Sequence, residues 1–182
     1  MDQSKLAVRY AKAFFELAKE KGQLDELRQD MGQIRKLCDE NADFKMMIES
    51  PVIKTSLKMK LMDAVLEGKV SKLTQNFIRL ITHNKRESNL VSICRNFVSL
   101  YNRDKGIRTV VLTSAVPLSD SLVDKIRSLL EQELNSPVEL SRKVEPGLIG
   151  GFVLRIDDKQ VDTSISARLK RIKTILLQSD IK

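Results

Sequence analysis

The chain has 182 residues, of which 42% are hydrophobic and 31% are charged, and its net charge at pH 7 is +8. This balance is typical of a folded protein and excludes a disordered chain, which has too little apolar surface to offset the entropy lost on folding. The longest apolar run is far shorter than the roughly 20 residues that span a bilayer, and the first residues lack a secretory-signal pattern, so we expect a cytoplasmic protein without a membrane-spanning helix.

Six helices are predicted in residues 1–105. Apolar side chains recur every three or four residues over residues 4–19 and 24–37, a spacing that places them on one helical face. Asn41 is a suitable cap for a short third helix, which Pro51 ends because its ring disfavours the helical conformation one residue earlier. Three further apolar stripes predict the remaining helices: Leu57, Leu61, Ala64 and Val65; Leu73, Phe77, Leu80 and Ile81; and Leu90, Ile93, Phe97 and Leu100. Because short helices are marginally stable alone, we expect all six to pack as one bundle.

The residue pattern changes after Gly106. Residues 107–115 are rich in β-branched side chains that alternate along the chain, which predicts a strand. A second strand is predicted at residues 138–144. Between them, Ser119 can cap a helix with the apolar face Leu122, Val123, Ile126, Leu129, Leu130 and Leu134.

A third strand is predicted at residues 149–156, which include Gly150 and Gly151. Residues 157–159 are polar and predict a turn, after which Asp162 or Thr163 is a suitable helix cap. The apolar side of that last helix comprises Ile165, Leu169, Ile172 and Leu176.

The predicted fold class is α+β in two domains. Residues 1–105 form the six-helix bundle, and residues 106–182 form a small mixed α/β module of strand, helix, two strands and helix. Positive and negative side chains are interleaved along both domains, as on a solvated surface. A basic face that binds an acidic protein segment remains an alternative use of the excess positive charge.

No group of side chains in the sequence predicts catalysis. His83 is the only histidine and stands at a predicted helix end, where capping or surface exposure is the usual role. Cys38 and Cys94 form no C-x-x-C pair and fall in apolar helical patterns, so we expect buried reduced thiols, with a disulfide as the alternative. Adjacent carboxylates such as Asp157 and Asp158 lie in polar stretches. The sequence therefore predicts no catalytic residue, no metal site and no cofactor.

Residues 147–151, Gly-Leu-Ile-Gly-Gly, are the one motif that resembles a phosphate-binding loop. A P-loop continues with Lys and Ser or Thr and opens a helix, and neither feature follows here. The same residues contain the G-x-x-G of KH domains, which clamp a nucleic-acid backbone, but that loop lies between helices and this one lies between predicted strands. A close-packed turn is the structural interpretation, and nucleic-acid binding stays as the alternative.

Three segments, in this order, resemble one protein family. Residues 9–15 read Arg-Tyr-Ala-Lys-Ala-Phe-Phe, residues 84–86 read Asn-Lys-Arg with Leu90 following, and residues 144–156 read Val-Glu-Pro-Gly-Leu-Ile-Gly-Gly-Phe-Val-Leu-Arg-Ile. The pattern is completed by Asp162, Ser164, Ile165, Arg168 and Leu169. Over essentially its whole length the chain thus resembles the delta subunit of F-type ATP synthases, whose mitochondrial counterpart is the oligomycin-sensitivity-conferring protein.

The resemblance implies that residues 1–105 sit on the catalytic head and bind the N-terminal helix of an alpha subunit in a groove between the first and fifth helices. The residues that correspond to this groove are Tyr10, Ala13, Phe14, Leu17, Phe77, Ile78, Ile81 and Asn84. Because the same apolar stripes must also close the bundle, we expect about half of this set to be core residues without a partner contact.

The resemblance further implies that residues 106–182 hold the C-terminal region of the b subunit of the peripheral stalk. The candidate residues are Gly150, Gly151, Asp162 and Ser164, for which shaping a turn and a helix start is the structural alternative. The expected function is that of a non-catalytic stator connector, bound to the cytoplasmic face of a bacterial inner membrane only through its complex. Neither a nucleic acid nor a small-molecule substrate is expected as a partner.

Overall fold

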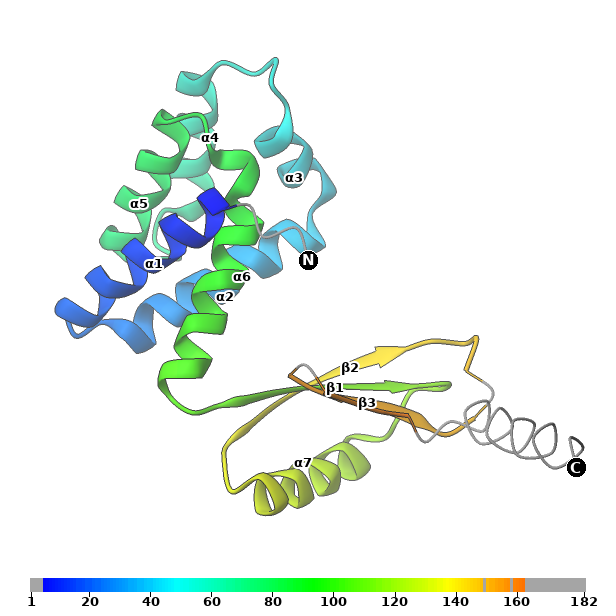
Figure 1. Cartoon of the computed structure of the whole chain (residues 1–182). Helices are drawn as coiled ribbons and strands as arrows, with labels where there is room; N and C mark the ends of the chain where they lie inside the picture. The colour runs from blue at the N-terminus through cyan, green and yellow to red at the C-terminus, as the bar shows by residue number, and fades with distance from the viewer. Residues whose placement is uncertain (1–4, 149, 158, 163–182) are drawn as a thin grey trace, which may run out of the picture. The chain divides into compact units, whose positions relative to one another are not determined.

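The computed structural model describes residues 5–148, 150–157 and 159–162 of the chain, and within them the fold is α+β (Figure 1). These residues contain seven α-helices and one mixed four-stranded sheet. Contacts divide the chain into two compact units, Met1–Tyr101 and Asn102–Lys182. No helix in the described part of the chain is long and apolar enough to cross a membrane.

The helices of the first unit begin and end close to the positions that the sequence predicts. Asn41 caps its helix as predicted, because its side-chain oxygen accepts a hydrogen bond from the Phe44 amide at 3.0 Å. The elements before the first strand are α1 (Lys5–Glu20), α2 (Leu24–Glu40), α3 (Ala42–Glu49), α4 (Thr55–Leu66), α5 (Lys72–His83), the short 3-10 helix η1 (Glu87–Asn89) and α6 (Leu90–Asp104).

The core of the first unit is aliphatic with a small aromatic centre. Phe97 of α6 packs against both Phe14 and Phe15 of α1, with ring centroids 5.4 and 5.9 Å apart. Both cysteines, Cys38 and Cys94, are buried and free, which confirms the predicted reduced thiols. The fully buried aliphatic side chains around them include Leu27, Met31, Ile34, Ile81, Leu90 and Ile93.

The buried face of α4 is not the one expected from its apolar stripe. Leu57 and Leu61 are exposed, whereas Lys58, Met62 and Leu66 are buried. Lysine is tolerated inside because its ammonium group is paired with a carboxylate and hydrogen-bonded to the end of α3. The expectation that the Leu57 and Leu61 stripe closes the core is therefore wrong.

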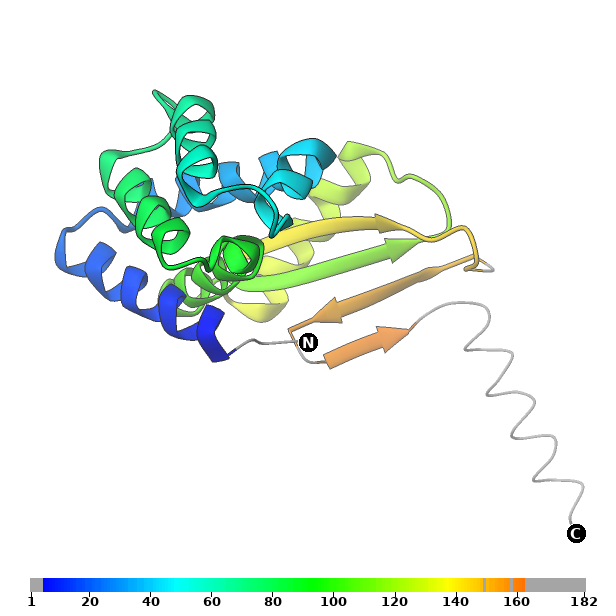
Figure 2. The ribbon, with the colours of Figure 1, turned by 90° about the horizontal axis from the view of Figure 1, so that it is seen from above.

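The second unit is built on a sheet with the strand order β2-β1-β3-β4 (Figure 2). Strands β1 and β2 are parallel, and the pairs β1 with β3 and β3 with β4 are antiparallel, which confirms the expected mixed sheet. The elements are β1 (Arg108–Ser114), α7 (Asp120–Leu134), β2 (Val138–Val144), β3 (Phe152–Ile156) and β4 (Lys159–Asp162).

Helix α7 covers one face of this sheet. The buried centre consists of Val110, Leu112, Val138 and Leu154, which partly buried residues of α7 cover, among them Ile126, Leu130 and Leu134. Leu122 and Leu129 belong to the expected apolar face of α7 but are exposed, so the contact with the sheet is narrower than expected.

The end of the second unit departs from the expected element order. The third strand begins at Phe152, after Gly150 and Gly151 and not with them. A fourth strand, β4, begins at Lys159, where the sequence predicts the end of a polar turn. Ile156 pairs with Lys159, so the chain reverses direction between these two residues. The described part of the module is therefore strand, helix and three strands. The expected last helix and Thr163 and Ser164 lie outside the described residues.

Candidate partner-binding face

Helices α1 and α5 lie side by side and run in opposite directions (Figure 1). The rings of Phe14 and Phe77 are stacked with centroids 3.9 Å apart and planes inclined by 7°. One helical turn nearer the start of α1, the Asn84 amide donates a hydrogen bond to the Tyr10 hydroxyl at 3.4 Å. The structure thus brings together residues that are 63 to 74 positions apart in sequence.

On α1, the four predicted binding residues differ in exposure. Phe14 is only 1% exposed and belongs to the core, while Ala13 is exposed. Tyr10 and Leu17 are half-buried and pack against the edge of the core. Since Tyr10, Ala13 and Leu17 are spaced by three and four residues, they form one stripe beside the core. Leu6, four residues before Tyr10, is also half-buried and continues the stripe.

On α5, only part of the predicted set can meet a partner. Ile78 and Ile81 are 2% and 0% exposed, so they act as core residues. Phe77 is 9% exposed and lies at the inner edge of the stripe, and Asn84 is exposed as the C-cap of the helix. The residues that complete the stripe on this helix are Leu73, which is half-buried, and Leu80, which is exposed.

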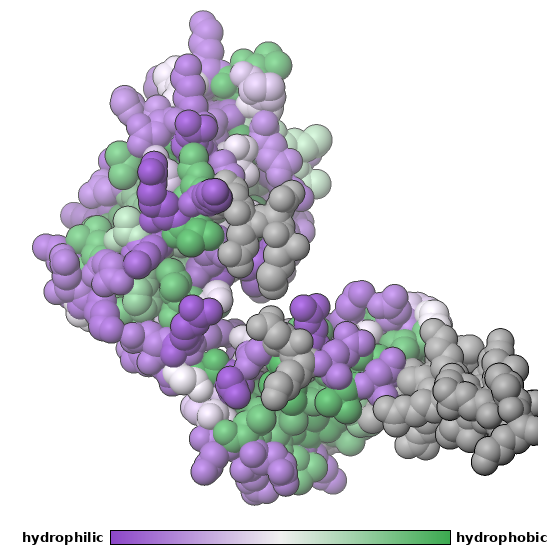
Figure 3. Space-filling model, viewed as in Figure 1, coloured by the Kyte–Doolittle hydropathy of each residue, from purple (hydrophilic) through white to green (hydrophobic). Residues whose placement is uncertain are grey.

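We call the combined stripe the α1/α5 face. It consists of Leu6, Tyr10, Ala13 and Leu17 of α1 with Leu73, Phe77, Leu80 and Asn84 of α5. Figure 3 shows green apolar side chains among purple polar ones over α1 and α5. The sequence reasoning missed Leu6, Leu73 and Leu80 as candidates. Their spacing of three or four residues from Tyr10, Phe77 and Asn84 was the signal that could have found them.

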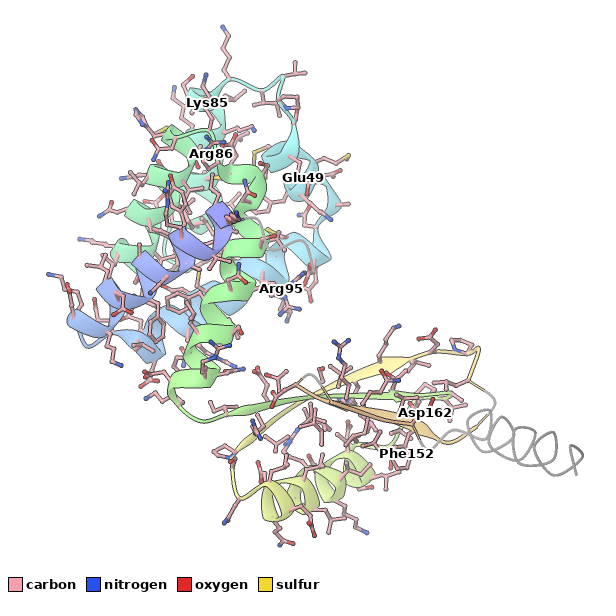
Figure 4. The ribbon with its side chains drawn as sticks, in the orientation of Figure 1. Glu49, Lys85, Arg86, Arg95, Phe152 and Asp162 are labelled. Atoms are coloured by element: carbon pink, nitrogen blue, oxygen red, sulfur yellow. The ribbon has the colours of Figure 1, made fainter. Side chains whose placement is uncertain are left out.

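The second predicted set lies at one end of the sheet. Gly150 and Gly151 precede β3 with positive φ angles of 71° and 78°, a backbone region that favours glycine. Asp162 is exposed and pairs with Val153 in the register of β3 and β4, so it stands beside the start of β3 (Figure 4). The structure therefore brings Gly151 and Asp162 to the same end of the sheet, while Ser164 lies outside the described residues.

The two cysteines and the histidine in the described residues occupy core or surface positions. Burial raises the pKa of the Cys38 thiol to about 11, with a smaller contribution from Asp39, and burial also raises the pKa of Cys94. Both thiols are thus protonated at neutral pH. His83 is exposed at the last residue of α5. Within the described ranges no group of three or more His, Cys, Asp and Glu side chains could hold a metal ion.

These features define a class of protein: a two-unit α+β protein that presents an apolar two-helix face. Comparison with known proteins identifies the family. The family model of the ATP synthase delta (OSCP) subunit matches residues 6–176. The chain is 35% identical over 171 residues to ATP synthase subunit delta of Rhodospirillum centenum, which covers 93% of this chain and 92% of that protein. It is 34% identical to the subunit of the same name in Symbiobacterium thermophilum, over 96% and 94% of the two chains.

A solved structure has the same fold. A chain in the cryo-EM structure of the Toxoplasma gondii mitochondrial ATP synthase hexamer matches with a TM-score of 0.76 and 24% identity, covering 94% of this chain and 97% of that one. The protein therefore belongs to the ATP synthase delta (OSCP) subunit family. It is a structural, non-catalytic subunit of the F-type ATP synthase and a component of its stator.

Proposed function

We propose that this chain joins the catalytic head of the ATP synthase to the peripheral stalk. Its helical part, residues 1–105, acts as a six-helix bundle that binds the N-terminal helix of an alpha subunit. Its second part, residues 106–182, binds the C-terminal region of the b subunit. Held at both sites, the head cannot turn with the rotor, so rotor torque drives the catalytic sites.

The observation that carries the proposal is the α1/α5 face. Leu80 is 52% exposed, and Leu73, Tyr10 and Leu17 of the same face are half-buried. An apolar strip between two antiparallel helices is the surface on which the apolar side of an amphipathic helix packs. Asn84 and the Tyr10 hydroxyl supply a polar contact at one end of it.

The proposed stalk contact uses the end of the sheet near Gly150, Gly151 and Asp162. The two glycines form a turn with positive φ angles, which residues with a side chain rarely adopt, and Asp162 presents an exposed carboxylate beside that turn. Ser164 completes this proposed site from outside the described residues. The glycines shape the turn, so the contact with the b subunit falls to Asp162 and its neighbours.

The proposed location follows from these partners. The chain associates with the cytoplasmic face of a bacterial inner membrane through the complex alone, without a cofactor, a small-molecule substrate or a nucleic acid. The alternative of nucleic-acid binding makes a distinct prediction, since phosphate contacts give affinity that falls steeply with salt, whereas apolar helix binding depends on salt only weakly.

The experiment is calorimetric titration of the full chain with a synthetic peptide of the alpha subunit N-terminal region from the same organism. We expect a one-to-one complex with a negative heat-capacity change, which marks burial of apolar surface. A folded chain that gives no heat of binding with this peptide would falsify the head contact. A parallel titration with the C-terminal region of the b subunit tests the stalk contact independently.

A further inference from the structure

The α1/α5 face is flanked by a stripe of charged side chains whose sign changes along α1. Arg9, Ala13, Glu16 and Glu20 are spaced by four, three and four residues, so they share one side of the helix, beside the apolar stripe. All four are exposed. Within the described part of the chain, neither Arg9 nor the two glutamates form an ion pair or a side-chain hydrogen bond. The first half of this flank is basic and the second half is acidic.

The turn that follows α5 adds positive charge at the Arg9 end. The hydrogen bond between Asn84 and Tyr10 fixes which end of α5 lies beside the start of α1. Lys85 adopts a positive φ of 56° and ends the helix, and the Arg86 amide donates to the Ile81 carbonyl at 3.0 Å. Both Lys85 and Arg86 are exposed and without an ion pair in the described residues (Figure 4).

At the other end, Lys72 comes one residue before Leu73 and is turned by about 100° around α5, as Arg9 is from Tyr10 on α1, so this exposed lysine also flanks the face. Lys19 comes two residues after Leu17 and is turned by about 200° around α1. The face therefore has a basic end, formed by Arg9, Lys85 and Arg86, and an end with a net negative charge, where Glu16 and Glu20 outnumber Lys72.

We infer that the α1/α5 face accepts an amphipathic helix in one direction only, with the acidic end of that helix over Arg9 and Arg86. This inference rests on the proposed function, because it specifies the charge pattern and direction of the same partner helix. The apolar stripe provides affinity in either direction. The charges decide between the two directions, since one places opposite charges together and the other places like charges together at both ends.

Paramagnetic labelling tests the direction. A spin label is attached in turn to each end of the alpha subunit N-terminal peptide, and amide signals of the isotope-labelled full chain are followed by NMR. We expect the label on the more acidic end to broaden Tyr10 and Asn84, and the label on the other end to broaden Leu17 and Leu73. The reverse pattern, or equal broadening from both labels, overturns the inference while leaving the head contact intact. A peptide that does not bind overturns both.

Charge variants give a second, independent readout. Arg9→Glu with Arg86→Glu should weaken peptide binding by about tenfold at low salt and by less at high salt, because exposed ion pairs contribute modestly and are screened by salt. The matched control is Lys45→Glu with Lys60→Glu, which makes the same change in net charge on exposed positions of α3 and α4. Equal weakening by both pairs would mean that only net charge matters and would overturn the inference.

Discussion

Lys58 and Glu87 form an ion pair inside the helical unit, with the ammonium nitrogen 2.6 Å from the carboxylate oxygen Oε1. The Lys58 side chain is only 3% exposed, and it also donates a hydrogen bond to the Ile48 carbonyl at 2.8 Å. One lysine on α4 thereby ties the end of α3 to η1. This contact also holds the turn that carries Lys85 and Arg86, because η1 begins at the next residue.

The first prediction concerns this pair. Glu87→Gln should lower the free energy of unfolding by about 3 kcal/mol, because a buried ammonium group then lacks its counter-charge. Adding Lys58→Met should recover most of that loss, since a similar-sized apolar side chain replaces the unpaired charge. Urea denaturation followed by circular dichroism measures both variants. Additive losses in the double variant would show that the two groups do not stabilise each other.

The second prediction concerns Asp30, a buried carboxylate on α2. Its oxygen Oδ2 accepts hydrogen bonds from the Ser71 amide, the Ser71 hydroxyl and the Thr74 hydroxyl at 3.0, 2.7 and 2.6 Å. These contacts fix the start of α5, so Asp30→Ala should cost about 3 kcal/mol in unfolding free energy. Asp39→Ala is the matched control on the same helix, because Asp39 is exposed and forms an exposed ion pair with Arg35 at 3.6 Å. Equal losses in both variants would contradict the role of Asp30.

Structural features that depend only on residues close together in the sequence were predictable. The Asn41 cap and strand β2 are local signals, and β2 spans the predicted residues 138–144. The buried face of α4 was not predictable, because Lys58 can be buried only when Glu87, 29 positions later, supplies its counter-charge. Strand β4 was missed because the predicted turn reached Lys159 and a helix cap was expected at Asp162 or Thr163, whereas the strand is ordered by pairing with β3.

The candidate binding face was predictable only in part, for a geometric reason. The apolar residues of α5 occupy two neighbouring sides of the helix, one facing the core and one facing outward. The apolar spacing in the sequence does not separate the residues of these two sides. Ile81 faces the core and Leu80 faces outward, although they are adjacent and equally apolar. Which of the two sides lies beside α1 became clear only from the stacked rings of Phe14 and Phe77.

The third prediction tests the α1/α5 face. Leu80→Glu should weaken binding of the alpha subunit peptide by at least about tenfold, because a charge would be buried against the apolar side of the partner. Leu57→Glu is the control, since Leu57 on α4 is 51% exposed and Leu80 is 52% exposed, but Leu57 lies off the face. Calorimetry measures the affinities, and thermal unfolding checks that both variants fold. Similar affinities for the two variants would exclude Leu80 from the interface.

The fourth prediction concerns pH and the two thiols. Burial keeps Cys38 and Cys94 protonated in the folded state, with the Cys38 pKa raised from 9.0 to about 11. Since the folded pKa lies above the unfolded one, this contribution to stability is present below pH 9 and declines as the pH rises towards 11. The fall in unfolding free energy over this range should be smaller in Cys38→Ala with Cys94→Ala. Identical pH profiles for this variant and the parent chain would contradict the assignment.

The fifth prediction concerns the turn before β3. Gly151→Ala should lower the free energy of unfolding of the second unit by about 1 kcal/mol or more, because its φ of 78° is strained for any residue with a side chain. Gly147→Ala is the matched control four residues earlier: Gly147 has no positive φ, and a methyl group there meets no atom within 4 Å.

Urea denaturation gives the stabilities of these glycine variants, and titration with the b-subunit region gives their affinities. Weaker b-subunit binding by Gly151→Ala, with Gly147→Ala unchanged, would tie the shape of this turn to the stalk contact. A Gly151→Ala chain as stable as the parent would remove the backbone argument for glycine at this position.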